Sequence, residues 1–112
     1  MRVLSIEPGK APEVRDLKDE LSTLQEAVGG LIQVVYPFRD PVALVCNDEG
    51  KLLGMEPNRA LRHPETGEVY DVVVGPFFLC GLGEEDFISL SDELLAKYRK
   101  EFRYPELFIP SL

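Results

Sequence analysis

The stretch LIQVVYPFRDPVALVC, residues 31–46, contains two runs of aliphatic and β-branched residues on either side of a connection bounded by prolines. Such residues favour strands, and proline interrupts a strand because it lacks a backbone N–H. The pattern therefore predicts one strand over 31–36 and a second over 42–46. We expect these strands to pair through the short connection at 38–41.

Further segments with strand character flank this pair. They are 3–6 and 13–15, joined by the turn residues Glu7 to Lys10, and 69–74 and 77–82. Gly75 and Pro76 separate the last two strands and cannot continue a ladder, so they imply a bulge, a bend or a sheet edge. The consecutive residues Phe77 and Phe78 must point to opposite faces of a sheet. One of them therefore leaves the main core unless a second layer, a subunit or a ligand covers it.

Two helices are expected. Asp16 is placed to cap the first helix, which Gly29 and Gly30 end, and Ser91 is placed to cap the second. The apolar positions of each helix recur at helical spacing and form one inward face. These positions are Leu17, Leu21, Leu24 and Val28 in the first helix, and Leu94, Leu95, Tyr98 and Phe102 in the second.

These elements predict an α+β fold in a single domain over residues 1–112, a length that fits one hydrophobic core. We expect a mainly antiparallel mixed sheet of about five to seven strands, with both helices packed on one face. The tail at 104–112 is apolar, so it is expected to dock on its own domain or on a partner chain. Docking on a partner would make a homodimer.

The formal charge of −8 is concentrated in one region, because residues 63–96 contain eight acidic side chains and neither lysine nor arginine. Such a region repels phosphate backbones, which excludes direct DNA binding through it. It suits either a solvated surface or docking on a basic protein surface. The apolar runs are far shorter than the roughly 20 residues of a membrane span, so a soluble protein is expected.

The cysteines Cys46 and Cys80 lie in apolar segments, where a free thiol usually behaves as a small buried hydrophobe. A disulfide between them stays open as an alternative. The opening residues lack the features of a secretory signal, which favours the cytoplasm.

Candidate catalytic and metal-binding groups are sparse. His63 is the single histidine, and it lies in a polar loop far along the chain from either thiol. Two thiols and one imidazole do not form a zinc motif, and the acidic run at 84–86 lacks the alternating ligands of a calcium loop. A hydrolase that uses Asp71 or Asp86 has no second motif to support it. We therefore expect a protein that is not an enzyme and that uses no cofactor and no metal.

The segment GKLLGMEPNRA, residues 50–60, carries the candidate ligand site. Pro57 is expected to stiffen the first turn of a short helix from which Asn58 and Arg59 project. Guanidinium forks, amides and helix-start N–H groups are suited to phosphate. The alternative is structural, with Arg59 paired to a carboxylate such as Glu56 and Asn58 capping the turn.

Three strings resemble a family of small domains of unknown function from Gram-positive bacteria, their plasmids and their phages. They are MRVLSIEPGKAPEV at 1–14, VYPFRDPVALVCNDEGKLLGMEPNRAL at 35–61 and GPFFLCGLGEEDFISLSDE at 75–93. The resemblance supplies no activity and no catalytic residue. It implies a protein that travels on mobile elements, where small proteins act against host defences by occupying a host protein or by capturing a nucleotide signal.

Together these features predict a non-enzymatic, cytoplasmic binding protein, a homodimer, that sequesters a phosphate-bearing nucleotide signal in counter-defence. The expected ligand contacts are Lys10, Asn58, Arg59, Arg62 and Phe78. The alternative is an acidic inhibitor, a possible mimic of nucleic acid, that binds a host defence protein or a nucleic-acid-handling protein. Its expected interaction residues are Glu84, Glu85 and Asp86.

Overall fold

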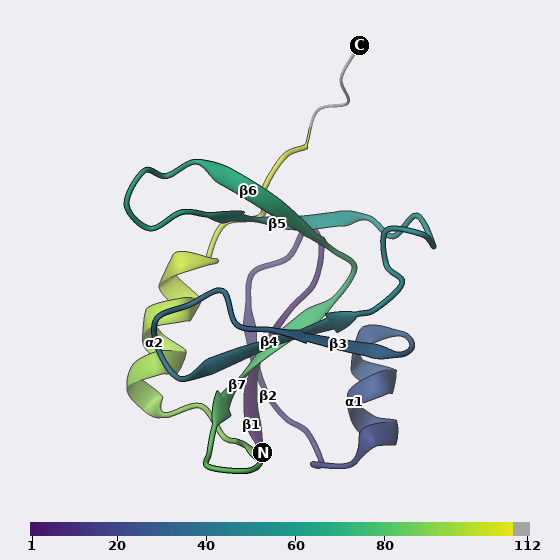
Figure 1. The fold of residues 1–112 in the computed structure, drawn as a ribbon, viewed down its shortest axis with the longest axis vertical. Coiled ribbons are helices and arrows are strands. Elements are labelled where there is room, and N and C mark those ends of the chain that lie inside the picture. The colour runs from purple at the N-terminus through teal and green to yellow at the C-terminus, as the bar shows by residue number, and fades with distance from the viewer. Residues whose placement is uncertain (109–112) are drawn as a thin grey trace.

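The computed structural model describes residues 1–108 and shows an α+β fold, as predicted (Figure 1). The elements are β1 (Arg2–Ile6), β2 (Glu13–Asp16), α1 (Leu21–Val28), β3 (Ile32–Val35), β4 (Val42–Asn47), β5 (Pro57–Arg62), β6 (Val69–Val74), β7 (Phe77–Leu82), β8 (Phe87–Ile88) and α2 (Asp92–Glu101). The main sheet has the order β2-β1-β7-β4-β3, with β8 also paired to β7, and all of its pairs are antiparallel. Strands β5 and β6 form a separate two-stranded sheet.

The main sheet is buried on both faces. One face packs against α1 and includes Phe78 and Cys80. The other face packs against α2 and the β5–β6 hairpin and includes Phe77 and Cys46. In Figure 1, α1 and α2 accordingly lie on opposite sides of the sheet, with the hairpin above it. The prediction that both helices share one face is therefore wrong, whereas the prediction that Phe77 and Phe78 point to opposite faces is confirmed.

The physical reason for two covered faces lies in the central strands. Every residue of β4, from Val42 to Asn47, is buried, and five of the six residues of β7 are buried. A strand that is apolar at consecutive positions needs cover on both sides, whereas a strand with one wet face alternates apolar and polar residues. The same alternation separates the two thiols, because Cys46 and Cys80 belong to different cores and both are free.

The first helix begins later than predicted. Asp16 ends β2, and α1 starts after Glu20. The cause is pairing with β1: the N-terminal amino group lies 2.9 Å from the Asp16 carboxylate, and the Leu17 N–H donates to the Met1 carbonyl. Because of this pairing, Asp16 and Leu17 lie beside β1 instead of in the first turn of the helix, where the local capping signal predicted them. The predicted helix end is confirmed, because Gly29 adopts a left-handed conformation with φ of 79°.

The second helix begins as predicted. The Leu94 N–H donates to the Ser91 hydroxyl at 3.2 Å, and two acidic residues occupy the first turn, where the helix dipole favours them. Beyond α2, Glu106 holds the described part of the tail on β5, because its carboxylate accepts from the Ala60 N–H at 3.1 Å. Residues 109–112 of the predicted apolar tail lie outside the described residues. Across 1–108, no helix is long and apolar enough to cross a membrane.

Candidate functional site

The predicted turn at Pro57 is a strand. Residues 57–62 form β5, which pairs with β6 and has an irregular register between Pro57 and Arg59. Proline is tolerated at the first position of a strand, where no ladder hydrogen bond is required of it. The expected short helix start, with its outward N–H groups, therefore does not form here.

Asn58 and Arg59 are interior residues, each with 1% of its surface exposed. The Asn58 amide donates to the Ile6 carbonyl at 2.9 Å and to the Gly75 carbonyl at 2.8 Å. These bonds connect β5 to β1 and to the β6–β7 bend. The prediction that this amide faces a ligand is wrong.

The Arg59 guanidinium also forms its hydrogen bonds inside the protein. It donates to the Phe102 carbonyl at 3.1 and 3.3 Å, to the Lys10 carbonyl at 2.6 Å and to the Asn58 side-chain oxygen at 2.8 Å. Burial lowers the pKa of this guanidinium from its usual value, and the charge of Glu106 opposes that shift. Its partners are carbonyls rather than the expected Glu56 carboxylate. Arg59 therefore joins the end of α2 to the β1–β2 turn.

The remaining members of the predicted ligand set do not come together. The exposed Lys10 amine pairs with Glu7 at 3.1 Å, and Arg62 pairs with Glu106 at 2.8 Å. Phe78 is 1% exposed and packs beneath α1, so it cannot stack on a base from solvent. The predicted ligand site around Asn58 and Arg59 is therefore a set of structural contacts that connect β5 to β1, to α2 and to the β6–β7 bend.

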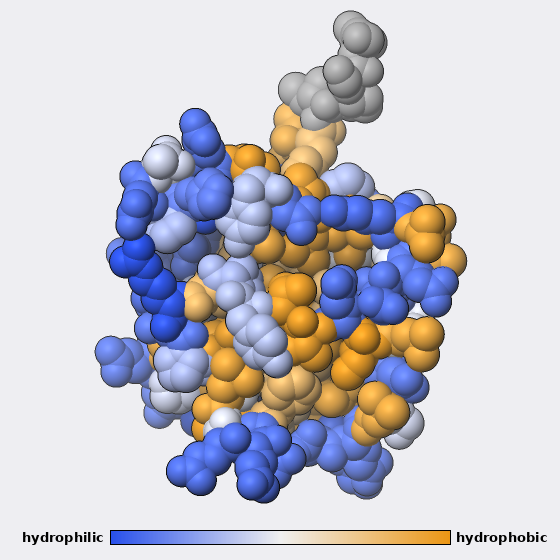
Figure 2. All heavy atoms as spheres, in the orientation of Figure 1, coloured by the Kyte–Doolittle hydropathy of each residue, from blue (hydrophilic) through white to orange (hydrophobic). Residues whose placement is uncertain are grey.

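A groove of about 490 Å³ lies instead where α1, β3 and the β7–β8 turn meet. Its lining combines apolar side chains with a cluster of carboxylates. The apolar members are Leu21, Leu24, Ile32, Tyr36, Leu82 and Phe87, and the carboxylates are Asp19, Glu84, Glu85 and Asp86. Leu21 is 59% exposed and Tyr36 is 62% exposed, so part of this apolar surface faces water. Figure 2 shows hydrophobic residues gathered over the middle of this face and hydrophilic residues along its lower rim.

The tight β7–β8 turn presents the acidic run. The Gly83 N–H donates to the Asp86 carbonyl at 2.9 Å, and a Cβ at Gly81 would lie 2.7 Å from the Ser89 carbonyl oxygen. Glycine at these positions thus lets the two short strands approach closely. The turn projects Glu84 and Glu85 into solvent beside the groove.

The charge of the acidic region is unevenly neutralised. Glu65, Asp71 and Asp92 form ion pairs with Arg39, Lys51 and Arg2 respectively. Within residues 1–108, the four carboxylates that line the groove form no ion pair. The groove therefore gathers four carboxylates that no cation of this part of the chain neutralises.

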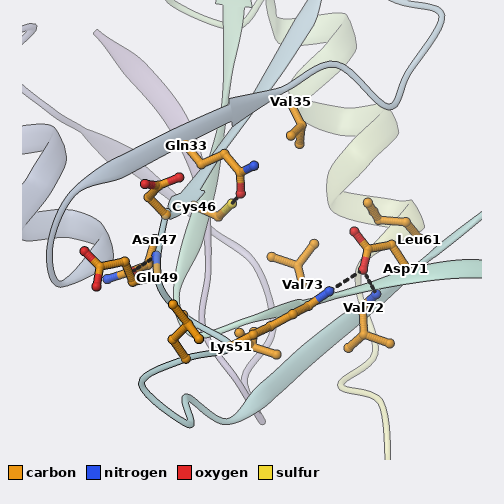
Figure 3. Close-up of a pocket in the computed structure, with 14 residues that line it drawn as sticks. Gln33, Val35, Cys46, Asn47, Glu49, Lys51, Leu61, Asp71, Val72 and Val73 are labelled. Atoms are coloured by element: carbon orange, nitrogen blue, oxygen red, sulfur yellow. Dashed lines mark hydrogen bonds and ion pairs between the residues drawn. The ribbon is translucent and has the colours of Figure 1, made fainter.

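A second hollow of about 250 Å³ separates the main sheet from the β5–β6 hairpin (Figure 3). Figure 3 shows Gln33, Val35 and Cys46 of the main sheet on one side, facing Asp71 and Lys51 on the other. The Lys51 amine lies 2.7 Å from the Asp71 carboxylate. We call this hollow the hairpin cleft.

The titratable groups of the hairpin cleft include a paired carboxylate and a buried thiol. The hydrogen bond from Lys51 holds the pKa of Asp71 below its usual value, so this carboxyl is not a proton donor at neutral pH. Burial raises the pKa of Cys46, which disfavours the reactive thiolate. His63 stacks beside Tyr70, with ring centroids 4.7 Å apart. In the described chain, no three histidine, cysteine or acidic side chains gather as a metal site.

Sequence reasoning found the acidic run at 84–86 but missed the groove that it borders. Asp19, Leu21 and Tyr36 come from three segments, and each looks ordinary within its own segment. The helical spacing predicts that Leu21 lies on the buried face, yet this residue begins α1, is exposed and lines the groove. The one signal that could have suggested a surface of this kind is Tyr36, an exposed aromatic residue that directly follows β3.

The fold and its two hollows define a small α+β protein whose most distinctive surface is an acidic groove with an apolar floor. The family model described as a domain of unknown function (DUF3846) matches residues 1–103. The chain therefore belongs to that family. Searches of curated proteins and of solved structures found no match.

Proposed function

We propose that this protein is a non-enzymatic binding protein that docks the acidic groove onto a basic and partly apolar surface of another protein. The observation that carries the proposal is the exposed apolar floor, with Leu21 and Tyr36, beside carboxylates that lack internal partners. Apolar contact would supply affinity, and the carboxylates would supply steering and selectivity. The resemblance to proteins of mobile elements suggests a host protein as the partner, and a nucleic-acid-binding surface has the required charge.

Sequestration of a nucleotide signal is the less supported function. Its main donors, Asn58 and Arg59, already bind carbonyls of this chain and are closed to solvent. The groove itself is negative and would repel a phosphate. The geometry thus favours the acidic, protein-directed alternative.

The test uses a fluorescent peptide of alternating lysine and valine, about eight residues long, as the basic apolar probe. We expect measurable binding that weakens steeply between about 0.05 M and about 0.5 M salt, because the Debye length shortens severalfold. The double substitution Glu84→Lys with Glu85→Lys should weaken binding at low salt by about tenfold or more, since two attractions become repulsions.

The matched control is Glu68→Lys with Glu93→Lys. These residues are also exposed and lie in the same acidic region, so the total charge changes equally. The control should retain most of the affinity, within about threefold, because neither residue lines the groove and exposed charges outside it are screened. Equal losses in both double variants, or no binding of the peptide at low salt, would contradict the groove as a docking site.

A further inference from the structure

Within residues 1–108, the outer edge of β3 is an unprotected strand edge. Strand β3 is the last in the order β2-β1-β7-β4-β3 and pairs on one side with β4. No charged residue or proline occurs from Leu31 to Tyr36, and the run is rich in β-branched residues. Proteins usually protect such edges with charges, prolines or bulges because a free edge recruits further strands.

The opposite edge of the same sheet shows that protection. Strand β2 follows Pro12 and contains Glu13, Arg15 and Asp16 in only four residues. The two edge strands of the main sheet therefore differ, since β2 carries charges and follows a proline and β3 has neither. The contrast singles out β3 as the edge that is open to pairing.

The register identifies which backbone groups of β3 are free. The Asp48 N–H donates to the Leu31 carbonyl, and Gln33 lies opposite Cys46. Hydrogen-bonded pairs recur at every second residue of an antiparallel ladder. The N–H and C=O groups of Ile32 and Val34 consequently point away from β4, toward the open edge.

The side chains of β3 alternate between the two hollows described above. Ile32 and Tyr36 line the acidic groove, whereas Gln33 and Val35 line the hairpin cleft (Figure 3). Because successive side chains of a strand point to opposite faces, a strand added beside β3 would direct its own side chains alternately toward these two hollows.

Both hollows are negative beside β3. The groove contains four unpaired carboxylates, and the hairpin cleft contains Asp48, Glu49 and Asp71 against the single amine of Lys51. A second copy of this chain would bring the same carboxylates to the interface. Charge complementarity therefore selects an extended basic segment of a different protein rather than a second β3.

We infer that a partner binds by strand addition, with an extended segment of alternating apolar and basic side chains that pairs with the free edge of β3. This inference rests on the proposed docking function and names its mode. The main-chain hydrogen bonds to Ile32 and Val34 supply part of the affinity. All the basic side chains of such a segment point to one face of the added strand, toward the unpaired carboxylates of the groove, and the apolar side chains point to the other face, toward the hairpin cleft with its valines.

The first experiment places proline at the free edge. Val34→Pro removes an N–H that is not used by the β4 ladder and obstructs an incoming strand, so the lysine–valine peptide should bind at least about tenfold more weakly. The matched control is Val14→Pro on β2. The Leu17 N–H donates to the Met1 carbonyl, so by the same alternation the Val14 N–H also points outward. The control should bind the peptide as the wild type does.

The second experiment needs no variant. Amide hydrogen exchange of the wild-type protein, measured residue by residue with NMR, should slow by about tenfold or more at Ile32 and Val34 when saturating lysine–valine peptide is added. A glutamate–valine peptide should cause no slowing. Sedimentation of the protein alone should give the mass of a monomer, in which no second copy covers β3.

The outcomes separate the two proposals. Peptide binding that depends on Glu84 and Glu85, without slower exchange at Ile32 and Val34, would overturn strand addition and leave groove docking standing. Absence of binding would overturn both. A dimer of the free protein that already protects these two amides would overturn the choice of a basic partner segment.

Discussion

Replacement of Arg59 by alanine should destabilise the protein strongly, although the residue has the chemistry of a surface ligand contact. The guanidinium is 1% exposed and satisfies the Phe102 and Lys10 carbonyls. Each buried carbonyl that loses its donor costs about 1 to 3 kcal/mol, and the lost packing of the buried side chain adds to this. Relief of the cost of burying a charge offsets part of the loss.

The expected net loss is about 3 to 5 kcal/mol in the free energy of unfolding. For a chain of 112 residues, the usual entropy of unfolding converts this loss into a decrease of about 12 to 20 °C in Tm. Thermal unfolding followed by circular dichroism, together with urea denaturation, measures both quantities. Arg59→Lys should give an intermediate loss, because an amine keeps the charge but lacks the planar fork.

The matched control is Arg62→Ala, three residues along the same strand. Its side chain is 49% exposed and pairs with Glu106, so the loss should stay within about 1 kcal/mol. A Tm of Arg59→Ala within about 2 °C of the wild type would refute the reasoning. Such a result would return Arg59 to the exposed, ligand-facing role that the sequence first suggested.

Two further predictions concern titration. Hydrogen bonds from Lys97 and Tyr98 hold the pKa of Asp40 below its usual 3.8. The stabilisation from these bonds is fully present above pH 3.8 and is lost as the pH falls through the lower pKa of the folded state. In Asp40→Asn, Tm measured against pH should therefore fall less steeply below about pH 4 than in the wild type. Burial raises the pKa of Cys80 to about 12, and burial also raises the pKa of Cys46. Iodoacetamide at pH 8 should therefore modify Cys80 only after unfolding in urea, which peptide mass mapping would show. Rapid modification of Cys80 in the native protein would contradict its buried position.

Local signals in the sequence were sufficient for several elements. The β-branched runs within 31–46 and the strands around Gly75 and Pro76 formed as expected, and Ser91 caps α2 as expected. Each of these outcomes depends on the propensity or capping chemistry of neighbouring residues. The exposure of the acidic run at 84–86 belongs to the same class, since carboxylates strongly prefer water.

The misassigned residues depend on distant partners. The Asn58 amide binds a carbonyl 52 positions away, and the Arg59 guanidinium binds carbonyls 43 and 49 positions away. Asp16 belongs to β2 rather than to a helix cap because it pairs with Arg2 of β1. A backbone carbonyl is present at every position, so no residue type in the sequence marks it as the acceptor of a particular arginine.

The sequence by itself determined the α+β class, the paired strands, the end of α1 at Gly29, the start of α2 at Ser91 and the excess of negative charge. These features depend on propensity, glycine and proline geometry and charge, which are properties of short segments. Only the tertiary structure decided that both faces of the sheet are covered, that Arg59 is sealed inside, and that an acidic groove lies beside the free edge of β3. The reason is physical: burial and complementarity arise from surfaces that meet only after the chain has folded.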